Sequence, residues 1–139
     1  MKKLATAICL VAVLFSQAGC STGKYVQGAD DQVVVFHKQL DDQQFLVIYD
    51  QADPKLRAAS KSDEFLAFLT AVHKKLGNVQ SATRQGFYVN FTTSGTRVNL
   101  TYKTKFAGGE AEEYFVWLKS GNDFKLLGYH INSNALIVN

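Results

Sequence analysis

The chain has 139 residues and a formal net charge of +3, and this length suits one domain. Lys2 and Lys3 lie in an N-terminal segment that we expect to be removed, and without them 13 Lys and Arg stand against 12 Asp and Glu. This excess of one positive charge is too small to indicate a nucleic-acid-binding protein, because such proteins usually carry a strongly basic surface. The single proline argues against a long disordered tail.

Residues 1–19 have the pattern of a secretory signal peptide. Met1-Lys2-Lys3 is a short positive start, and the apolar run Leu4–Phe15 is too short to span a bilayer as a permanent helix. Small residues follow, and the segment ends in Gln17-Ala18-Gly19-Cys20. Cleavage there would remove Cys9 and leave one cysteine, so we expect no internal disulfide.

The end of this segment resembles the lipobox of bacterial lipoproteins. In that family, small residues such as Ala18-Gly19 precede a cysteine that is lipidated and becomes the N-terminus. Gln17 departs from the aliphatic residue that is usual there, so Ser16-Gln17-Ala18 stays open as a site for ordinary signal peptidase. The resemblance implies a palmitate-bearing anchor on Cys20, and Ser21 after it resembles the outer-membrane class. We therefore expect an envelope protein that faces the periplasm.

The next segment, residues 20–28, is expected to hold the lipidated cysteine and a short polar tether, followed by one domain over residues 29–139. Asp30 or Asp31 is a suitable cap for a first helix. Helical spacing then places several residues on one face: Val33, Phe36, His37 and Leu40. We expect His37 on that face to be a hydrogen-bonded structural histidine.

Three further helices are expected before residue 78. One contains Phe45, Ile48 and Tyr49, and a short one begins at Asp53-Pro54 with Asp as cap. The strongest pattern is Ser62–Leu76, with Ser60 or Ser62 as its cap and Gly77 at its end. Its apolar stripe consists of Phe65, Phe68, Leu69, Val72 and Leu76.

The remainder, from Val79 to Ile131, reads as four strands joined by tight turns. Alternating runs rich in Val, Tyr, Phe and Thr are separated at Ser94-Gly95, Gly108-Gly109 and Ser120–Asp123. These connections are too short for parallel crossovers, so the sheet should be an antiparallel meander. Helices followed by a meander predict an α+β fold, with the N-terminal helices packed on a curved four-stranded sheet.

This order resembles the cystatin-like superfamily, specifically nuclear transport factor 2-like domains of unknown function. The residues that carry the resemblance are Tyr49–Arg57, Phe65-Leu66 in the following helix, and Leu76-Gly77 before the strands. It covers residues 30–131 and contains no diagnostic motif. The resemblance implies a cone with a cavity between helices and sheet, which hosts enzymes in some members and ligands in others, so the fold implies no activity.

Several residues are candidates for a pocket or a partner surface: Tyr49, Tyr102, Phe115, Trp117 and His130. Phe115 and Trp117 share one face of their strand while apolar residues also occupy the other, so one face should cover the helices and the other should form a cavity wall or a partner surface. The alternative is that Ala135–Val138 folds back over it. The three histidines lack metal-binding spacing, and we expect neither a metal nor another cofactor.

Three functions are compatible with these features. The first is a non-catalytic, lipid-anchored envelope module that binds a protein partner or a small apolar ligand, or that forms a homodimer through its sheet. The second is a small pocket enzyme of isomerase or dehydratase type, which would need Tyr49, Tyr102 or His130 beside a buried carboxylate. The third is an envelope inhibitor or immunity protein. A basic row on one strand, Arg97, Lys103 and Lys105, is either a solvated face or a contact for anionic lipid.

Overall fold

The computed structural model describes residues 20–138. Its first four helices are α1 (Cys20–Asp41), α2 (Phe45–Gln51), α3 (Pro54–Ala59) and α4 (Ser62–Leu76). The strands are β1 (Val79–Thr92), β2 (Gly95–Phe106), β3 (Gly109–Ser120) and β4 (Asp123–Asn132), and a short α5 (Asn134–Ile137) follows. The expected leader, residues 1–19, lies outside the described residues, so its cleavage and the lipidation of Cys20 stay predictions.

The four strands form one open antiparallel sheet in the order β1-β2-β3-β4, which confirms the predicted meander and the α+β class. Partner residues in the ladder lie on the same face, and Val98 pairs with Trp117 while Leu100 pairs with Phe115. All four of these side chains are buried. The alternation of apolar and polar residues along the strands therefore does separate a core face of the sheet from an outer face.

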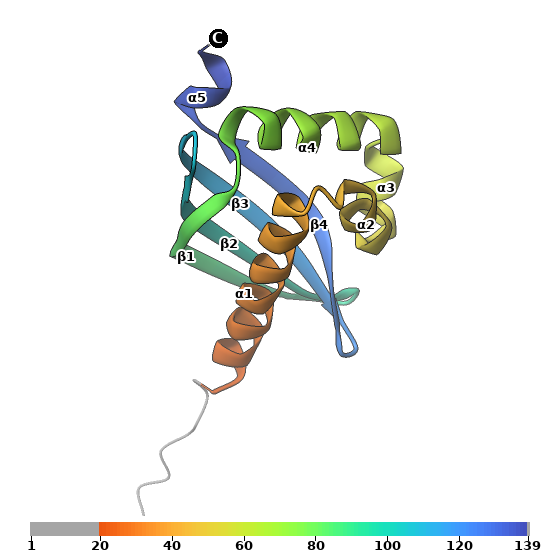
Figure 1. Ribbon diagram of the computed structural model, residues 1–139. Helices are drawn as coiled ribbons and strands as arrows, with labels where there is room; N and C mark the ends of the chain where they lie inside the picture. The colour runs from red at the N-terminus through yellow and green to blue at the C-terminus, as the bar shows by residue number, and fades with distance from the viewer. Residues whose placement is uncertain (1–19, 139) are drawn as a thin grey trace, which may run out of the picture.

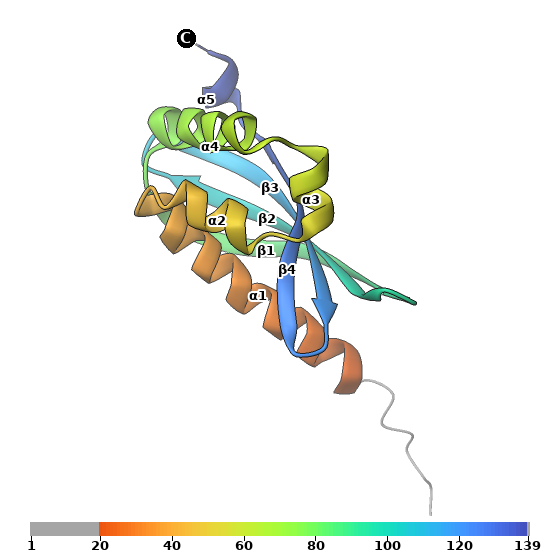
Figure 2. The same ribbon diagram turned by 90° about the vertical axis from the view of Figure 1, so that its right-hand side faces the viewer.

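The helices cover one face of this sheet (Figure 1). The helix α1 crosses the sheet diagonally, and α4 lies along the end from which α5 projects. Their inward side chains and the inward side chains of the strands make a single apolar core. Its fully enclosed members include Leu40, Leu69, Leu76 and Phe106. The outer face of the sheet has no helix over it among residues 20–138 (Figure 2).

The first helix starts earlier than the sequence predicted. Residues 21–28, expected as a tether, are the first turns of a 22-residue helix, and neither Asp30 nor Asp31 caps it. The reason is tertiary packing, because Val26 and Ala29 are 5% and 0% exposed and extend the buried stripe towards the N-terminus. No helix within residues 20–138 is long and apolar enough to cross a bilayer.

The later helices follow the sequence with two corrections. Asp53 caps α3 as expected, because its side chain accepts a 2.8 Å hydrogen bond from the Lys55 N–H, and Gly77 ends α4 with a φ of 71°. The cap residue of α4 is Lys61, whose side chain makes no cap bond, so neither Ser60 nor Ser62 has that role. Phe68, predicted to be buried, is 38% exposed. Its ring lies against Tyr129 at the border of the core, with a centroid distance of 6.0 Å.

Candidate functional site

A cleft of about 370 Å³ lies between α1, α2 and the β3–β4 hairpin. This volume is in the range of small-molecule sites. Its floor is made by side chains of the core, each less than a tenth exposed: Phe36, Ile48, Trp117 and Leu126. The floor is therefore apolar and fixed by the packing of the helices on the sheet.

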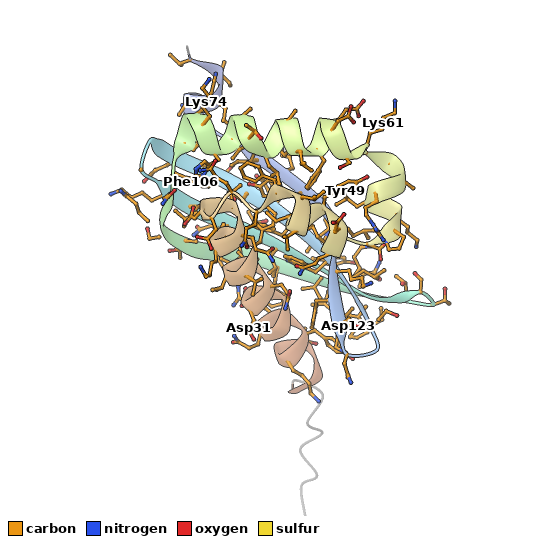
Figure 3. All side chains as sticks on the ribbon, turned by 45° about the vertical axis from the view of Figure 1, so that its right-hand side comes forward. Asp31, Tyr49, Lys61, Lys74, Phe106 and Asp123 are labelled. Atoms are coloured by element: carbon orange, nitrogen blue, oxygen red, sulfur yellow. The ribbon has the colours of Figure 1, made fainter. Side chains whose placement is uncertain are left out.

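Side-chain amides dominate the rim of the cleft. Gln32 and Gln39 come from α1, Gln51 ends α2, and the Gln39 Nε2 donates a 3.0 Å hydrogen bond to the Gln51 Oε1. The opposite rim is polar as well, and Figure 3 places Asp123 of this rim on the β3–β4 hairpin. That rim consists of Asn122, Asp123 and Lys125. Most of the polar groups are neutral donors and acceptors, which suits an uncharged ligand.

Two close contacts hold the β4 wall of the cleft in place. A Cβ on Gly28 would lie 2.6 Å from Cε2 of Phe124, so the Phe124 ring rests directly on the α1 backbone at this glycine. The Asp53 N–H donates a 2.8 Å hydrogen bond to the Leu126 carbonyl, which joins the start of α3 to β4. Only glycine allows the first of these contacts without moving the ring.

Trp117 lines this cleft and has a buried polar atom. Its side chain is 5% exposed and stacks almost parallel on Phe115, with an interplanar angle of 9°. Its Nε1 is buried and has no hydrogen-bond partner among the described residues. A buried donor without a partner costs about 1–3 kcal/mol.

A second polar group lies inside the core, around Glu113 of β3. Its carboxylate is 0% exposed. The Oε2 atom lies 2.7 Å from the His37 Nε2 and accepts a hydrogen bond from the Thr104 hydroxyl, while Oε1 accepts one at 2.7 Å from the Tyr129 hydroxyl. Every partner comes from a different element, so α1, β2 and β4 all bind the one carboxylate on β3.

The Glu113 network is sealed by aromatic rings. Phe36 packs on Phe115 and Tyr129 with centroid distances of 5.2 and 4.7 Å, and His37 lies against the same group. Burial, and then the neighbouring Glu113 charge, raise the pKa of Tyr129 well above its usual value. Tyr129 also lines a shallow cleft of about 320 Å³ with Phe65 and Phe68, whereas Glu113 and His37 are buried and do not line it. The network therefore joins elements of the fold, as expected for a structural His37.

Two of the predicted pocket residues bind other parts of the fold. The Tyr49 hydroxyl donates to the Ser60 carbonyl at 2.9 Å and to the Arg57 carbonyl at 3.2 Å, which fastens α2 to α3. The Tyr102 hydroxyl donates to Oδ1 of Asp30 at 2.5 Å. Burial and this hydrogen bond raise the pKa of Tyr102. Neither hydroxyl is directed at the cleft beside Trp117.

The other three predicted residues separate onto two faces. Phe115 is 0% exposed in the core and Trp117 forms the cleft floor, whereas His130 lies on the outer face, 5.9 Å from the ring of Tyr114. The structure thus brings only Trp117 to this cleft. The C-terminal residues of the alternative interpretation pack elsewhere, against α4 and β3 (Figure 1).

The outer face keeps a partly apolar surface. Tyr88 is 63% exposed and Tyr114 is 38% exposed, and a shallow cleft of about 430 Å³ includes both.

The glutamines of the first cleft were not among the predicted site residues, because polar positions on a helix give no signal of a cleft. No group of three or more His, Cys, Asp and Glu side chains that could hold a metal ion occurs among the described residues.

Comparison with known proteins adds evidence on the fold. No family model matches the chain, and no curated protein matches it. A solved structure that resembles it is that of Bd1075 from Bdellovibrio bacteriovorus, with a TM-score of 0.54 and 11% sequence identity. The match covers 83% of this chain but 44% of that one, so the chain spans less than half of that protein. At this identity the likeness concerns the fold alone.

Proposed function

We propose that this chain is a lipid-anchored protein of the bacterial cell envelope whose domain binds a neutral ligand in the cleft beside Trp117. The ligand has an apolar part for the floor and hydrogen-bonding groups for the amides of the rim. The protein is a binding module of the nuclear transport factor 2-like type. Its place is the outer membrane, facing the periplasm.

The anchoring part of the proposal is supported by the sequence. A positive start, a twelve-residue apolar run and Ala18-Gly19-Cys20 follow one another in the order of a lipoprotein leader. Ser21 after the cysteine favours the outer membrane. Palmitate incorporation in a bacterial host tests this part, because it should occur in the natural sequence and disappear in Cys20→Ala. Equal labelling of both would contradict anchoring at Cys20.

The binding part is carried by one observation, the cleft of about 370 Å³ whose buried apolar floor includes Trp117. A concave site with an apolar floor and a few polar groups at its rim is the usual form of a small-molecule site. Around it, three glutamines and an asparagine can exchange hydrogen bonds with a ligand without a change in charge. These features fit recognition better than catalysis.

Trp117 is the single tryptophan and lines the cleft, so tryptophan emission reports on the surroundings of this one residue. We expect its emission to shift when neutral amides, alcohols and saccharides are titrated in, with benzamide as the first member of the panel. Val35 lines the cleft at 44% exposure, and Val34 beside it on α1 does not line it and is 69% exposed. Val35→Phe should abolish the response and the matched control Val34→Phe should keep it. No response from the whole panel, or the same response from both variants, would contradict the proposal.

The pocket-enzyme alternative has a specific observation in its favour, namely the buried carboxylate of Glu113 beside His37 and Tyr129. That chemistry needs substrate at the carboxylate. Glu113 and His37 are buried, and although the partly buried Tyr129 lines a shallow cleft beside Phe68, neither Glu113 nor His37 lines that cleft. The geometry gives more support to the cleft at Trp117, where a ligand has access.

A further inference from the structure

We propose that the end of the domain where α1 begins rests directly on an anionic phospholipid bilayer, with Phe91 and Lys119 in the headgroup layer. The inference builds on the proposed lipidation of Cys20, and it adds that the domain has one fixed orientation on the membrane. The acyl chains then hold the protein, and the surface of the domain contacts the lipid as well.

Three parts of the fold lie towards this end in Figures 1 and 2: the start of α1, the β1–β2 turn and the β3–β4 turn. Residues of all three line one shallow cleft of about 390 Å³. Tyr25 on α1 packs edge-on against Phe91 of β1, with ring centroids 5.6 Å apart. The Lys119 Nζ lies 5.7 Å from the Tyr25 ring and 5.8 Å from the Phe124 ring. We call these four residues the tip cluster.

The geometry of α1 leaves little distance between the anchor and the tip cluster. Because the helix begins at Cys20, there is no extended tether. Tyr25 is five residues along, about 7.5 Å at the helical rise of about 1.5 Å per residue. The headgroup layer on each side of a bilayer is about 5–8 Å thick. Val26 and Ala29 bury the next turn in the core, so the helix cannot swing away from the sheet.

The chemistry of this end suits an anionic lipid surface. Phe91 is 61% exposed although it is a large apolar side chain. Lys24 lies on α1, and Lys119 and Lys125 lie close to the β3–β4 turn. The one carboxylate within residues 119–125 is Asp123, and the first turn of α1 has no acidic residue. Aromatic rings and lysines together are typical of surfaces that lie in the membrane interface.

The basic row predicted as a lipid contact does not share this position. Arg97 is close to the β1–β2 turn, but Lys105 is eight residues further along β2, about 26 Å at about 3.3 Å per residue. The Nζ of Lys103 lies 3.3 Å from Oε2 of Glu110 instead. The lipid contact therefore belongs to the tip cluster and not to the row.

The test uses the full chain made in a bacterial host and purified in its lipidated form. Thr93→Cys places an environment-sensitive nitrobenzoxadiazole label at the exposed β1–β2 turn. Lys74→Cys places the same label at the opposite end, where Figure 3 shows Lys74 beside α5. Each protein is reconstituted into vesicles of phosphatidylethanolamine and phosphatidylglycerol, and the mass of the protein reports whether Cys20 carries the lipid.

We expect the label at residue 93 to become severalfold brighter and blue-shifted in these vesicles, and the label at residue 74 to stay as in solution. Phe91→Ser combined with Lys119→Glu should return the label at residue 93 to the level of residue 74 while the protein still floats with the vesicles. Equal emission from both labels on a lipidated protein would overturn the orientation alone. A mass without lipid would overturn the anchoring and, with it, the orientation.

Discussion

The His37 imidazole on α1 lies 2.7 Å from the Glu113 carboxylate on β3, although 76 positions separate the two residues in the chain. Thr104 and Tyr129 donate to the same carboxylate. One buried carboxylate therefore joins the helical half of the chain to three strands of the sheet. The Glu113 carboxylate has all of its hydrogen-bond partners only when the helices and the sheet are packed together. We therefore expect the stability of the fold to depend strongly on this residue.

Glu113→Ala should lower the free energy of unfolding by about 3–5 kcal/mol, because it leaves buried donors without an acceptor. Glu112→Ala is the matched control on the same strand, since its side chain is exposed and its removal should cost less than about 0.5 kcal/mol. Urea unfolding followed by circular dichroism measures both. Similar midpoints for the two variants would show that the network contributes nothing to stability.

The raised pKa of Tyr129 predicts a loss of stability at alkaline pH. The phenol keeps its proton more tightly when folded than when unfolded, where its pKa is near 10.0. The stabilisation is therefore complete below about pH 10 and is lost as the pH rises through the folded-state pKa. Tyr129→Phe should flatten the dependence of unfolding midpoints on pH above 10, whereas Tyr88→Phe, at an exposed position, should not. Identical alkaline slopes in all three proteins would exclude Tyr129 as their source.

Gly28→Ala should separate ligand binding from stability. The new methyl would displace the Phe124 ring, which lines the cleft, while alanine gains up to about 1 kcal/mol of helix propensity over glycine. We expect a small change in stability and a weaker fluorescence response to ligand. Gly23→Ala on the same helix meets nothing within 4 Å and should stabilise the protein without affecting binding. Unchanged binding in Gly28→Ala would mean that the Phe124 wall has no part in the site.

Asp53→Ala should weaken the join between α3 and β4. Its carboxylate accepts from the Lys55 N–H, and such caps contribute about 1 kcal/mol. Because the Asp53 N–H binds the Leu126 carbonyl at the cleft floor, amide hydrogen exchange should speed up in β4 as well as in α3. Faster exchange confined to α3 would indicate that the cap acts only on its own helix. The control is Asp63→Ala, at an exposed position in the first turn of α4.

The sheet was predictable because its signal is local. Successive side chains of β2 alternate between more and less buried positions, and each turn contains a glycine that tolerates positive φ. The start of α1 was missed because residues 21–28 are polar and include two glycines, and local preference there is weak. A signal was present all the same, since Val26, Ala29 and Val33 continue the helical spacing of Phe36.

The candidate site was predictable only in part. Trp117 was identified from the apolar faces of its strand. Glu113 could have been recognised, because it lies on the same face of β3 as the buried Ala111 and Phe115. A carboxylate on the core face of a sheet needs hydrogen-bond partners. The glutamines of α1 and α2 could not, since their convergence depends on how two helices pack against a distant hairpin.

A binding site beside Trp117 is tested most directly by the indole N–H signal of this residue in a ¹H–¹⁵N correlation spectrum. The chain contains one tryptophan, so one such signal is expected. This signal is expected to move when a neutral ligand such as benzamide binds beside Trp117, in the natural sequence and in Val34→Phe but not in Val35→Phe. An indole signal that stays in place in all three proteins, while the ligand shifts signals elsewhere, would contradict a binding site at this cleft.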